Sequence, residues 1–248
     1  LLMNIDTAMI LAGGLGTRFK EYTKDIPKPM IKANGQPLLI HIINFYKSYG
    51  VKNIIVLAGY KIENIHDYFK TNGNQLFSDE NTYSFNEEMK IKIVDTGKDT
   101  MTGGRIKKGF KYVKNNFSYL TYGDGIANVD LMKLKDFHKK FSPIVTLTAV
   151  RPPARFGSLD IENEKVIAFN EKKQANEGWI NGGFFILDKT VVNYIDNDNQ
   201  SFEKEPLSKL SKENKLNAYK HNGLFRPVDT IRELEILERE LENNDFDF

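Results

Sequence analysis

The chain has 248 residues, 40% of them hydrophobic and 27% charged, with a formal net charge of +2, which suits one globular domain and favours neither nucleic-acid nor membrane partners. The absence of cysteine excludes disulfides, zinc–thiolate sites and thiol nucleophiles. No apolar run approaches the roughly 18 residues of a membrane helix, and the first residues do not resemble a secretory signal, so we expect a cytoplasmic protein.

The first predicted element is a buried strand over residues 7–12, and a glycine-rich loop follows it. In this loop Gly13, Gly14 and Gly16 allow backbone N–H groups to approach a ligand closely. Arg18 and, further on, Lys28 of Pro27-Lys-Pro-Met30 add two cations. The dinucleotide and P-loop motifs are both absent. A glycine turn that binds nothing is less favoured than a loop that holds the phosphates of a nucleoside triphosphate.

The next predicted elements alternate between helix and strand. They are a helix near 37–49, a strand over 53–58, a helix over 62–69, a strand over 91–95, a helix over 103–114, a strand over 119–122, a helix over 130–140 and a strand over 144–150. Such a βαβ series predicts a Rossmann-like α/β fold, with a mostly parallel sheet and helices on both faces. Residues 71–89 are polar and are predicted to form a long loop.

Shorter elements are predicted after the two prolines at 152–153. They are strands over 158–161, 166–170 and 180–187, then helices near 203–213 and 230–243. We treat the chain as a single domain, residues 1–248, in which residues 1–150 form the nucleotide-binding half and residues 151–248 the half that binds the acceptor.

Two aspartates stand where a ligand is expected. Asp124 follows a predicted strand and lies between two glycines, and Asp229 precedes the last predicted helix. Each alone is more often a turn former or a helix cap. In an open α/β sheet, however, ligands bind at the carboxyl ends of the strands. Two carboxylates beside phosphate oxygens suit Mg²⁺, which takes one or two protein carboxylates. The sequence therefore predicts that Asp124 and Asp229 bind Mg²⁺.

Several motifs in chain order resemble the sugar-1-phosphate nucleotidyltransferases. They are Leu11-Ala-Gly-Gly-Leu-Gly-Thr-Arg18, Pro27-Lys-Pro-Met30, Tyr122-Gly-Asp-Gly125, Glu171-Lys172, Trp179-Ile-Asn-Gly-Gly-Phe184 and Pro227-Val-Asp-Thr230. The stretch from Asp95 to Arg105 is similar to the version found in glucose-1-phosphate cytidylyltransferases. This resemblance covers nearly the whole chain and implies the GT-A-like nucleotidyltransferase fold.

The resemblance also implies a reaction and its residues. CMP would pass from CTP to a sugar 1-phosphate, most simply glucose 1-phosphate, with Mg²⁺, giving a CDP-sugar for polysaccharide or deoxysugar synthesis. Catalysis would depend on Arg18, Lys28, Asp124 and Asp229, and the nucleotide would bind to Leu11, Ala12, Gly13, Gly14, Gly16, Thr17, Arg18, Lys28, Thr100, Arg105 and Gly123. The sugar phosphate would bind to Glu171, Lys172, Asn181 and Gly182. Family members resembling this chain assemble as trimers or hexamers, so a homo-oligomer is expected.

One departure from the family pattern bears on the acceptor. The usual Gly-Phe-Trp-Gln-Pro reads Gly223-Leu-Phe-Arg-Pro227, which brings the cation of Arg226 close to a proposed metal ligand. We therefore keep open a different phosphorylated acceptor. The use of dTTP or UTP is a separate alternative, against which the stretch from Asp95 to Arg105 argues without excluding it. A catalytically silent nucleotide-binding regulatory subunit is a further alternative. It is disfavoured because Arg18, Lys28, Asp124 and Asp229 are all present.

Overall fold

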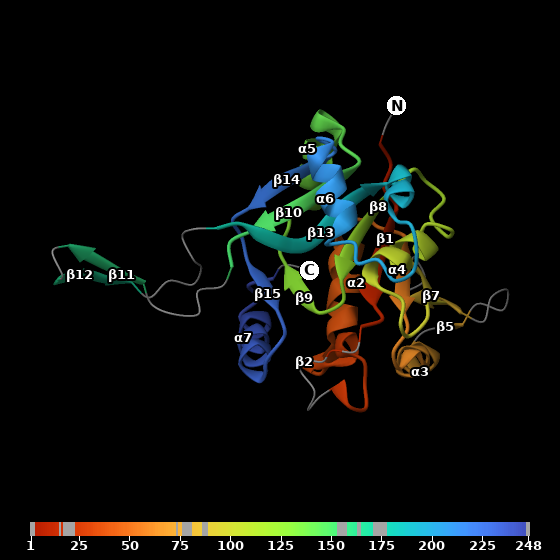
Figure 1. The fold of residues 1–248 in the computed structure, drawn as a ribbon. Helices are drawn as coiled ribbons and strands as arrows, with labels where there is room; N and C mark the ends of the chain where they lie inside the picture. The colour runs from red at the N-terminus through yellow and green to blue at the C-terminus, as the bar shows by residue number, and fades with distance from the viewer. Residues whose placement is uncertain are drawn as a thin grey trace.

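A mixed sheet forms the centre of the computed structural model (Figure 1). The structure describes residues 3–14, 16, 23–72, 74–75, 81–85, 89–152, 158–162, 165–170 and 178–246. Within these ranges the sheet has nine strands, in the spatial order β14 (Leu216–His221), β10 (Val145–Val150), β13 (Ile180–Asp188), β8 (Phe117–Tyr122), β1 (Thr7–Ala12), β4 (Asn53–Ala58), β7 (Met89–Asp95), β6 (Thr82–Phe85) and β5 (Asn74–Gln75).

Most strands of this sheet run in one direction. β8, β1, β4 and β7 pair in parallel, as do β10 and β14, whereas β13 is antiparallel to both of its neighbours. At the far edge β6 is antiparallel to β7 and to β5. Of the nine described strands, only β13 and β6 are therefore reversed, and the predicted α/β fold with a mostly parallel sheet is confirmed.

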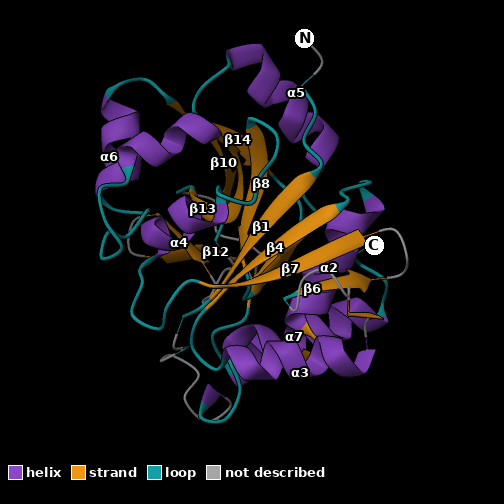
Figure 2. Cartoon of the chain, turned by 90° about the vertical axis from the view of Figure 1, so that its right-hand side faces the viewer, coloured by secondary structure: helices purple, strands orange, loops and turns teal. Residues whose placement is uncertain are grey.

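Helices cover both faces of the sheet (Figure 2). Ala8, Ile10 and Ala12 of β1 face a core shared with α2 (Leu38–Ser48), α3 (Ile62–Asn72), α5 (Leu131–Phe141) and α7 (Ile231–Glu242). Met9 and Leu11 face a second core shared with α4 (Thr102–Gly109) and α6 (Glu205–Lys212). Because both faces of β1 are buried, its sequence is an unbroken apolar run rather than an alternating one.

Several predicted elements match the observed ones closely. The strands at 7–12 and 53–58 have the predicted bounds, and the helices α2, α3, α5, α6 and α7 differ from prediction by at most a few residues. The helix predicted over 103–114 ends early, at Gly109. Glycine is a weak helix former, and here the carbonyl of Gly109 accepts from the N–H of Tyr112 in a turn.

The prediction of a long loop over residues 71–89 is wrong for the part that the structure describes. Residues Thr82–Phe85 form β6, in which Tyr83 and Phe85 are buried while Thr82 and Ser84 are half-buried. This alternation is the signature of a strand that packs on one face. The surrounding polar residues, which suggested a loop, concealed it. The rest of this stretch lies partly outside the described residues.

Short paired strands lie outside the main sheet. They are β2 (Lys32–Ala33) with β3 (Gln36–Pro37), β9 (Gly125–Ala127) with β15 (Phe225–Pro227), and β11 (Ser158–Glu162) with β12 (Lys165–Asn170). Two 3-10 helices are also described, the one-turn helix η2 (Lys28–Met30) and the two-turn helix η3 (Lys189–Tyr194). The antiparallel pair β9–β15 matters for function, because it brings the chain before Asp229 beside the chain after Asp124.

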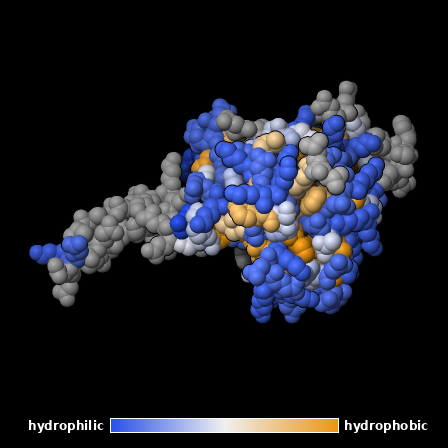
Figure 3. All heavy atoms as spheres, turned by 90° about the horizontal axis from the view of Figure 1, so that it is seen from above, coloured by the Kyte–Doolittle hydropathy of each residue, from blue (hydrophilic) through white to orange (hydrophobic). Residues whose placement is uncertain are grey.

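The surface seen in Figure 3 is mostly hydrophilic, with small apolar patches between polar side chains. Among the described residues, large exposed apolar side chains are scattered over the molecule, namely Tyr49, Met101, Tyr112, Met132, Phe141, Ile180 and Ile231. In the same part of the chain, no helix combines the length and the apolar character needed to cross a membrane.

Candidate active site

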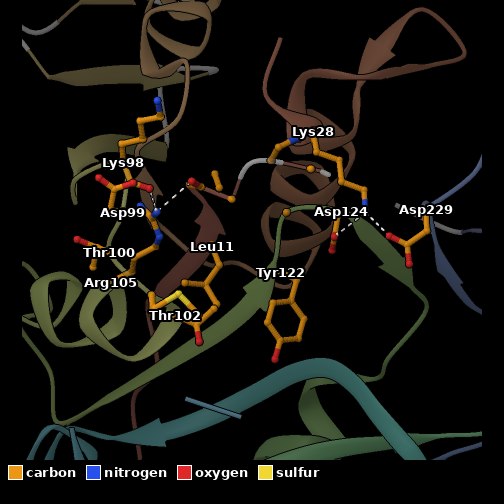
Figure 4. A pocket seen from close by; sticks show the side chains of 17 residues that line it. Leu11, Lys28, Lys98, Asp99, Thr100, Thr102, Arg105, Tyr122, Asp124 and Asp229 are labelled. Atoms are coloured by element: carbon orange, nitrogen blue, oxygen red, sulfur yellow. Dashed lines mark hydrogen bonds and ion pairs between the residues drawn. The ribbon is translucent and has the colours of Figure 1, made fainter. Parts of the chain in front are cut away.

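A cavity of about 600 Å³ opens at the carboxyl ends of β1 and β8 (Figure 4). Its volume falls within the roughly 300 to 1,000 Å³ typical of small-molecule sites. It is lined by Leu11, Ala12, Gly13, Gly14, Gly16, Lys28, Pro29, Lys98, Asp99, Thr100, Met101, Thr102, Arg105, Tyr122, Gly123, Asp124 and Asp229. The cavity thus lies at the edge of the sheet where the ligand was expected.

The structure brings most of the predicted site residues together around this cavity. Those that line it are Leu11, Ala12, Gly13, Gly14, Gly16, Lys28, Thr100, Arg105, Gly123, Asp124 and Asp229. Asn181 and Gly182, in β13, do not line it, but the Asn181 amide Nδ2 donates to the hydroxyl of Tyr122, which does. Thr17, Arg18, Glu171 and Lys172 lie outside the described residues. The binding role of each residue stays a prediction.

Lys28 reaches the cavity from the one-turn helix η2. Pro27 precedes this turn and Pro29 lies within it, and their fixed φ angles restrict its backbone. The carbonyl of Pro27 accepts from the N–H of Met30, and the carbonyl of Lys28 accepts from the N–H of Ile31. The Lys28 side chain is only 8% exposed. The Pro-Lys-Pro motif therefore directs a buried ammonium group at the floor of the cavity.

The Lys28 ammonium bridges the two aspartates (Figure 4). Its Nζ lies 2.9 Å from Oδ2 of Asp124 and 2.5 Å from Oδ1 of Asp229. Burial acts to lower the pKa of Lys28, but the charge of Asp124 and the hydrogen bonds to both carboxylates outweigh it and raise that pKa. Lys28 is therefore charged at neutral pH, although its side chain is buried.

Backbone hydrogen bonds hold both aspartates in place. The N–H of Gly123 donates to the carbonyl of Leu11, which fixes the turn after β8 against the end of β1. The N–H of Val228 donates to the carbonyl of Asp124, so the two aspartate-bearing segments are tied directly to each other. The N–H of Asp229 donates to the Glu233 carboxylate in the first turn of α7, a helix capped by the Thr230 hydroxyl.

The two carboxylates fit a divalent cation. Among the residues that the structure describes, no group of three or more His, Asp or Glu side chains forms a metal cage. Mg²⁺ does not need one, because it binds through one or two carboxylates and completes its coordination with water and phosphate oxygens. The Lys28 ammonium, held between Asp124 and Asp229, shows that these side chains already share one cation.

Arg105 forms the opposite wall of the cavity from the first turns of α4. Its guanidinium is buried and donates to the carbonyls of Ala58 (3.0 Å), Gly13 (3.0 Å) and Lys98 (3.2 Å), and to the hydroxyl of Thr96. Burial lowers the pKa of Arg105, while the charge of Asp95 acts to raise it. The described donors of Arg105 thus hold together the loop after β1, the end of β4 and the loop after β7, and direct contact with a nucleotide stays a prediction.

Gly13 is a glycine because Arg105 lies against its backbone. A Cβ at Gly13 would be 2.0 Å from the Nη1 atom of Arg105, much closer than non-bonded atoms can approach. Thr100, another predicted nucleotide ligand, uses its hydroxyl within the protein, where it donates to the carbonyl of Thr96 at 2.6 Å. Arg105 and Thr100 therefore determine the shape of the glycine loop and of the wall that faces it.

Sequence reasoning missed several lining residues. Lys98, Asp99, Met101 and Thr102 lie within the stretch that was singled out for its resemblance, so the signal was present although no role was assigned. Tyr122 belongs to the quoted Tyr-Gly-Asp-Gly motif but was read only as the end of a strand.

The structure contradicts the interpretation of Arg226 as a cation for the acceptor. Arg226 is only 8% exposed, and its guanidinium pairs through two bonds with the Glu240 carboxylate of α7, at 2.6 Å (Nε) and 2.5 Å (Nη2). Its Nη1 donates to the carbonyl of Phe225. Because Glu240 neutralises the charge, Arg226 fastens α7 to β15 and does not mark a different acceptor.

The chain matches a family of known proteins. The nucleotidyl transferase family model matches residues 7–225. A glucose-1-phosphate cytidylyltransferase of Salmonella typhi is 43% identical over 242 residues, which are 93% of this chain and 94% of that protein. A probable glucose-1-phosphate cytidylyltransferase of Bacillus subtilis is 40% identical over 92% of each chain. A D-glycero-alpha-D-manno-heptose 1-phosphate guanylyltransferase of Campylobacter jejuni is 37% identical over 75% of this chain and 77% of its own.

Solved structures agree with these relatives. HddC from Yersinia pseudotuberculosis, complexed with GMP-PN, superposes with a TM-score of 0.72 and 26% identity, covering 96% of this chain and all of its own. The inositol-1-phosphate CTP transferase of T. maritima shares the fold, with a TM-score of 0.71 at 15% identity over 99% of this chain and 98% of its own. The chain therefore belongs to the nucleotidyl transferase family, among the sugar-1-phosphate nucleotidyltransferases.

Proposed function

We propose that the protein is a Mg²⁺-dependent cytidylyltransferase that transfers CMP from CTP to glucose 1-phosphate. The Salmonella typhi relative is named a glucose-1-phosphate cytidylyltransferase and the Bacillus subtilis relative a probable one. Both are at least 40% identical to this chain, and each is matched over more than nine tenths of its length. The observation that carries the proposal is the Lys28–Asp124–Asp229 cluster at the floor of the cavity, beside the glycine loop. A catalytically silent subunit would have no need of this arrangement.

The reaction needs charge neutralisation more than proton transfer. A phosphate oxygen of glucose 1-phosphate attacks the α-phosphorus of CTP and forms the new P–O bond. The bond from that phosphorus to the oxygen bridging it to the β-phosphorus breaks, and pyrophosphate leaves with this oxygen and its electron pair. The attacking oxygen is already anionic, so no general base is required. The protein must align the reacting groups and stabilise negative charge on the phosphates.

Residues of this chain can supply both the alignment of the reacting groups and the stabilisation of negative charge. Backbone N–H groups of Gly13 and Gly14 would face the triphosphate, in a loop whose shape Arg105 maintains. Lys28 would place one positive charge at the floor, and Arg18 would add another. Mg²⁺, held by Asp124 and Asp229, would neutralise charge on the phosphate oxygens when bound. Glu171, Asn181 and Gly182 would bind the sugar, and Lys172 its phosphate.

The proposal also covers assembly and location. We expect a homo-oligomer, a trimer or a hexamer, which light scattering of the purified protein tests directly. Because CTP and sugar 1-phosphates are metabolites of the cytoplasm, we place the reaction there, as a step that supplies nucleotide sugars for polysaccharide or deoxysugar synthesis.

The test is pyrophosphate release with Mg²⁺ from CTP, dTTP, UTP, ATP and GTP, each with glucose, mannose, galactose and heptose 1-phosphates. Release from CTP with glucose 1-phosphate, at least tenfold faster than from any other pair, is the expected result. Release from GTP with a heptose 1-phosphate would instead align the chain with the guanylyltransferase relative. No release from any pair, together with measurable CTP binding, would contradict an enzymatic role.

A further inference from the structure

Glu203 bridges two sides of the candidate active site although it lies far from them in sequence. It precedes α6 and is separated by 81 residues from Tyr122 and by 101 residues from Thr102. Its Oε1 accepts from the Tyr122 hydroxyl at 2.7 Å, and its Oε2 accepts from the Thr102 hydroxyl at 2.6 Å. Tyr122 and Thr102 both line the cavity, one at the end of strand β8 and the other at the start of α4 (Figure 4).

The bond to Glu203 determines which way the Tyr122 hydroxyl points. An ionised carboxylate only accepts hydrogen bonds, so the Tyr122 O–H must donate to Glu203 and offer its oxygen to another donor. That donor is the Asn181 amide Nδ2, at 3.1 Å.

The same chain of bonds fixes the Asn181 amide. With Nδ2 bonded to Tyr122, the Oδ1 atom accepts from the N–H of Gly183 at 2.9 Å. Gly183 has a φ of +75°, and a Cβ there would lie 2.5 Å from the Tyr122 ring, so this turn requires glycine. Nitrogen and oxygen of the amide are thus distinguished by their partners. The Gly183 N–H, which can only donate, and the Tyr122 oxygen, which accepts because its own proton goes to Glu203, both favour this orientation.

The other oxygen of Glu203 fastens the nucleotide side of the cavity. The Thr102 hydroxyl that donates to it also accepts from the N–H of Phe202 at 2.8 Å. The N–H groups of Met101 and Gly103 donate to the carbonyls of Asp198 and Gln200. The start of α4, which carries the Thr100–Arg105 wall, is therefore attached to the segment around Glu203 by three further bonds that do not involve the Glu203 carboxylate, so the nucleotide side does not depend on it.

We propose that Glu203 is a positioning residue that orients the Asn181 amide through Tyr122 and so sets the selectivity of the acceptor site for the hydroxyl pattern of the sugar. The inference rests on the proposed function, since it takes the sugar 1-phosphate as the ligand that Asn181 meets. Glu203 touches neither substrate in this account. Its carboxylate holds the Tyr122 hydroxyl as an acceptor for the Asn181 Nδ2 group, and so reinforces the amide orientation that the Gly183 N–H also favours.

Kinetics of Glu203→Ala and Tyr122→Phe test the proposal. We expect each variant to raise the KM for glucose 1-phosphate by about 3- to 10-fold, the effect of one lost hydrogen bond, and to change the KM for CTP by less than about 2-fold. The double variant should be no worse than Tyr122→Phe, because the two residues act in one chain of bonds. The preference for glucose 1-phosphate over galactose 1-phosphate, as a ratio of kcat/KM, should fall.

Glu213→Ala is the matched control. Glu213 follows α6 and accepts from the Tyr194 hydroxyl at 2.6 Å. The substitution therefore removes the same kind of tyrosine–carboxylate bond at a residue that does not line the cavity. Both KM values of this variant should equal those of the wild type. Because Glu203 is exposed, its loss should leave Tm within about 1 °C of the wild-type value.

The outcomes are separable. An unchanged KM and an unchanged sugar preference in Glu203→Ala, with an active wild type, would overturn the inference and leave the proposed function standing. An equal rise in the KM for both substrates, or a lowered Tm, would also overturn it by showing a general structural role. If the wild type prefers another sugar 1-phosphate, the same measurements apply to that acceptor. A wild type that binds and turns over no sugar phosphate would overturn both.

Discussion

Two buried cations described in the cavity, Lys28 and Arg105, have different partners. Lys28 contacts two carboxylates, so these three groups together carry one net negative charge. The hydrogen bonds described for Arg105 all go to neutral acceptors, namely three backbone carbonyls and a hydroxyl. A carbonyl dipole satisfies a guanidinium without cancelling its charge. One end of the cavity therefore suits an anion such as a triphosphate, and the other end suits a divalent cation.

The largest effect should come from removing the charge of Lys28. Lys28→Met leaves the Asp124 and Asp229 carboxylates without their shared ammonium, and we expect kcat to fall by about 10²- to 10³-fold, or about 3 to 4 kcal/mol of barrier. Steady-state pyrophosphate release measures it. Lys32→Met, which removes a nearby exposed lysine, is the control. Equal kcat values for both variants would show that the paired cation has no part in the chemistry.

The next effect concerns an arginine outside the cavity that, unlike Arg105, is held by a carboxylate. Arg226→Gln leaves the Glu240 side chain, which is only 13% exposed, without its cation, and should lower the free energy of unfolding by about 3 kcal/mol. Urea unfolding measures it. Replacing both residues by leucine should recover most of the loss. A changed KM for the sugar phosphate at unchanged stability would instead return Arg226 to the acceptor site.

Arg105→Lys tests whether the carbonyl groups around Arg105 need only its positive charge or also the geometry of its guanidinium. One ammonium group cannot replace the forked guanidinium that bonds Gly13, Ala58 and Lys98. We expect a loss of about 2 kcal/mol in unfolding free energy, together with weaker CTP binding, because buried carbonyls lose their donors. If CTP binding weakened while stability stayed the same, Arg105 would act on the nucleotide directly rather than through the loops.

A smaller effect is expected from the glycine that lies on Arg105. In Gly13→Ala the new methyl group must displace the guanidinium, so we expect a loss of about 1 to 2 kcal/mol in unfolding free energy. In Gly14→Ala the new methyl group meets no atom of a described residue within 4 Å, and the change should stay within about 0.5 kcal/mol. Thermal unfolding of the two variants compares them, and equal losses would contradict the close packing of Arg105.

The smallest expected effect is the pH dependence of the stability that Lys28 contributes, which should be absent near neutral pH. A raised lysine pKa contributes stability at every pH below the ordinary value of 10.5, and this contribution is lost only as pH rises through the raised value. The difference in Tm between wild type and Lys28→Met should therefore stay constant from about pH 7 to 10. A difference that shrinks within this range would mean that the two carboxylates do not hold Lys28 in its charged form.

The predictable parts of the fold were those with a local signal. The strands of the sheet centre, β1 and β4, are apolar runs because both of their faces are buried. β6 was missed because its two buried aromatic residues stand among polar neighbours, which were given more weight than their alternation. β14 was also missed, since it lies at the edge of the sheet and is only partly buried.

The candidate site also has features with a local sequence signal and features that only the tertiary structure shows. The sequence by itself determined the glycine loop, Lys28 between its prolines, and two aspartates at the ends of apolar segments, because short-range backbone geometry places them. Only the tertiary structure decided which groups neutralise one another: Lys28 with Asp124 and Asp229, Arg226 with Glu240, and Glu203 with Tyr122. The physical reason is distance. A hydrogen bond or ion pair depends on a few ångströms in space, and residue types in a sequence do not specify that separation.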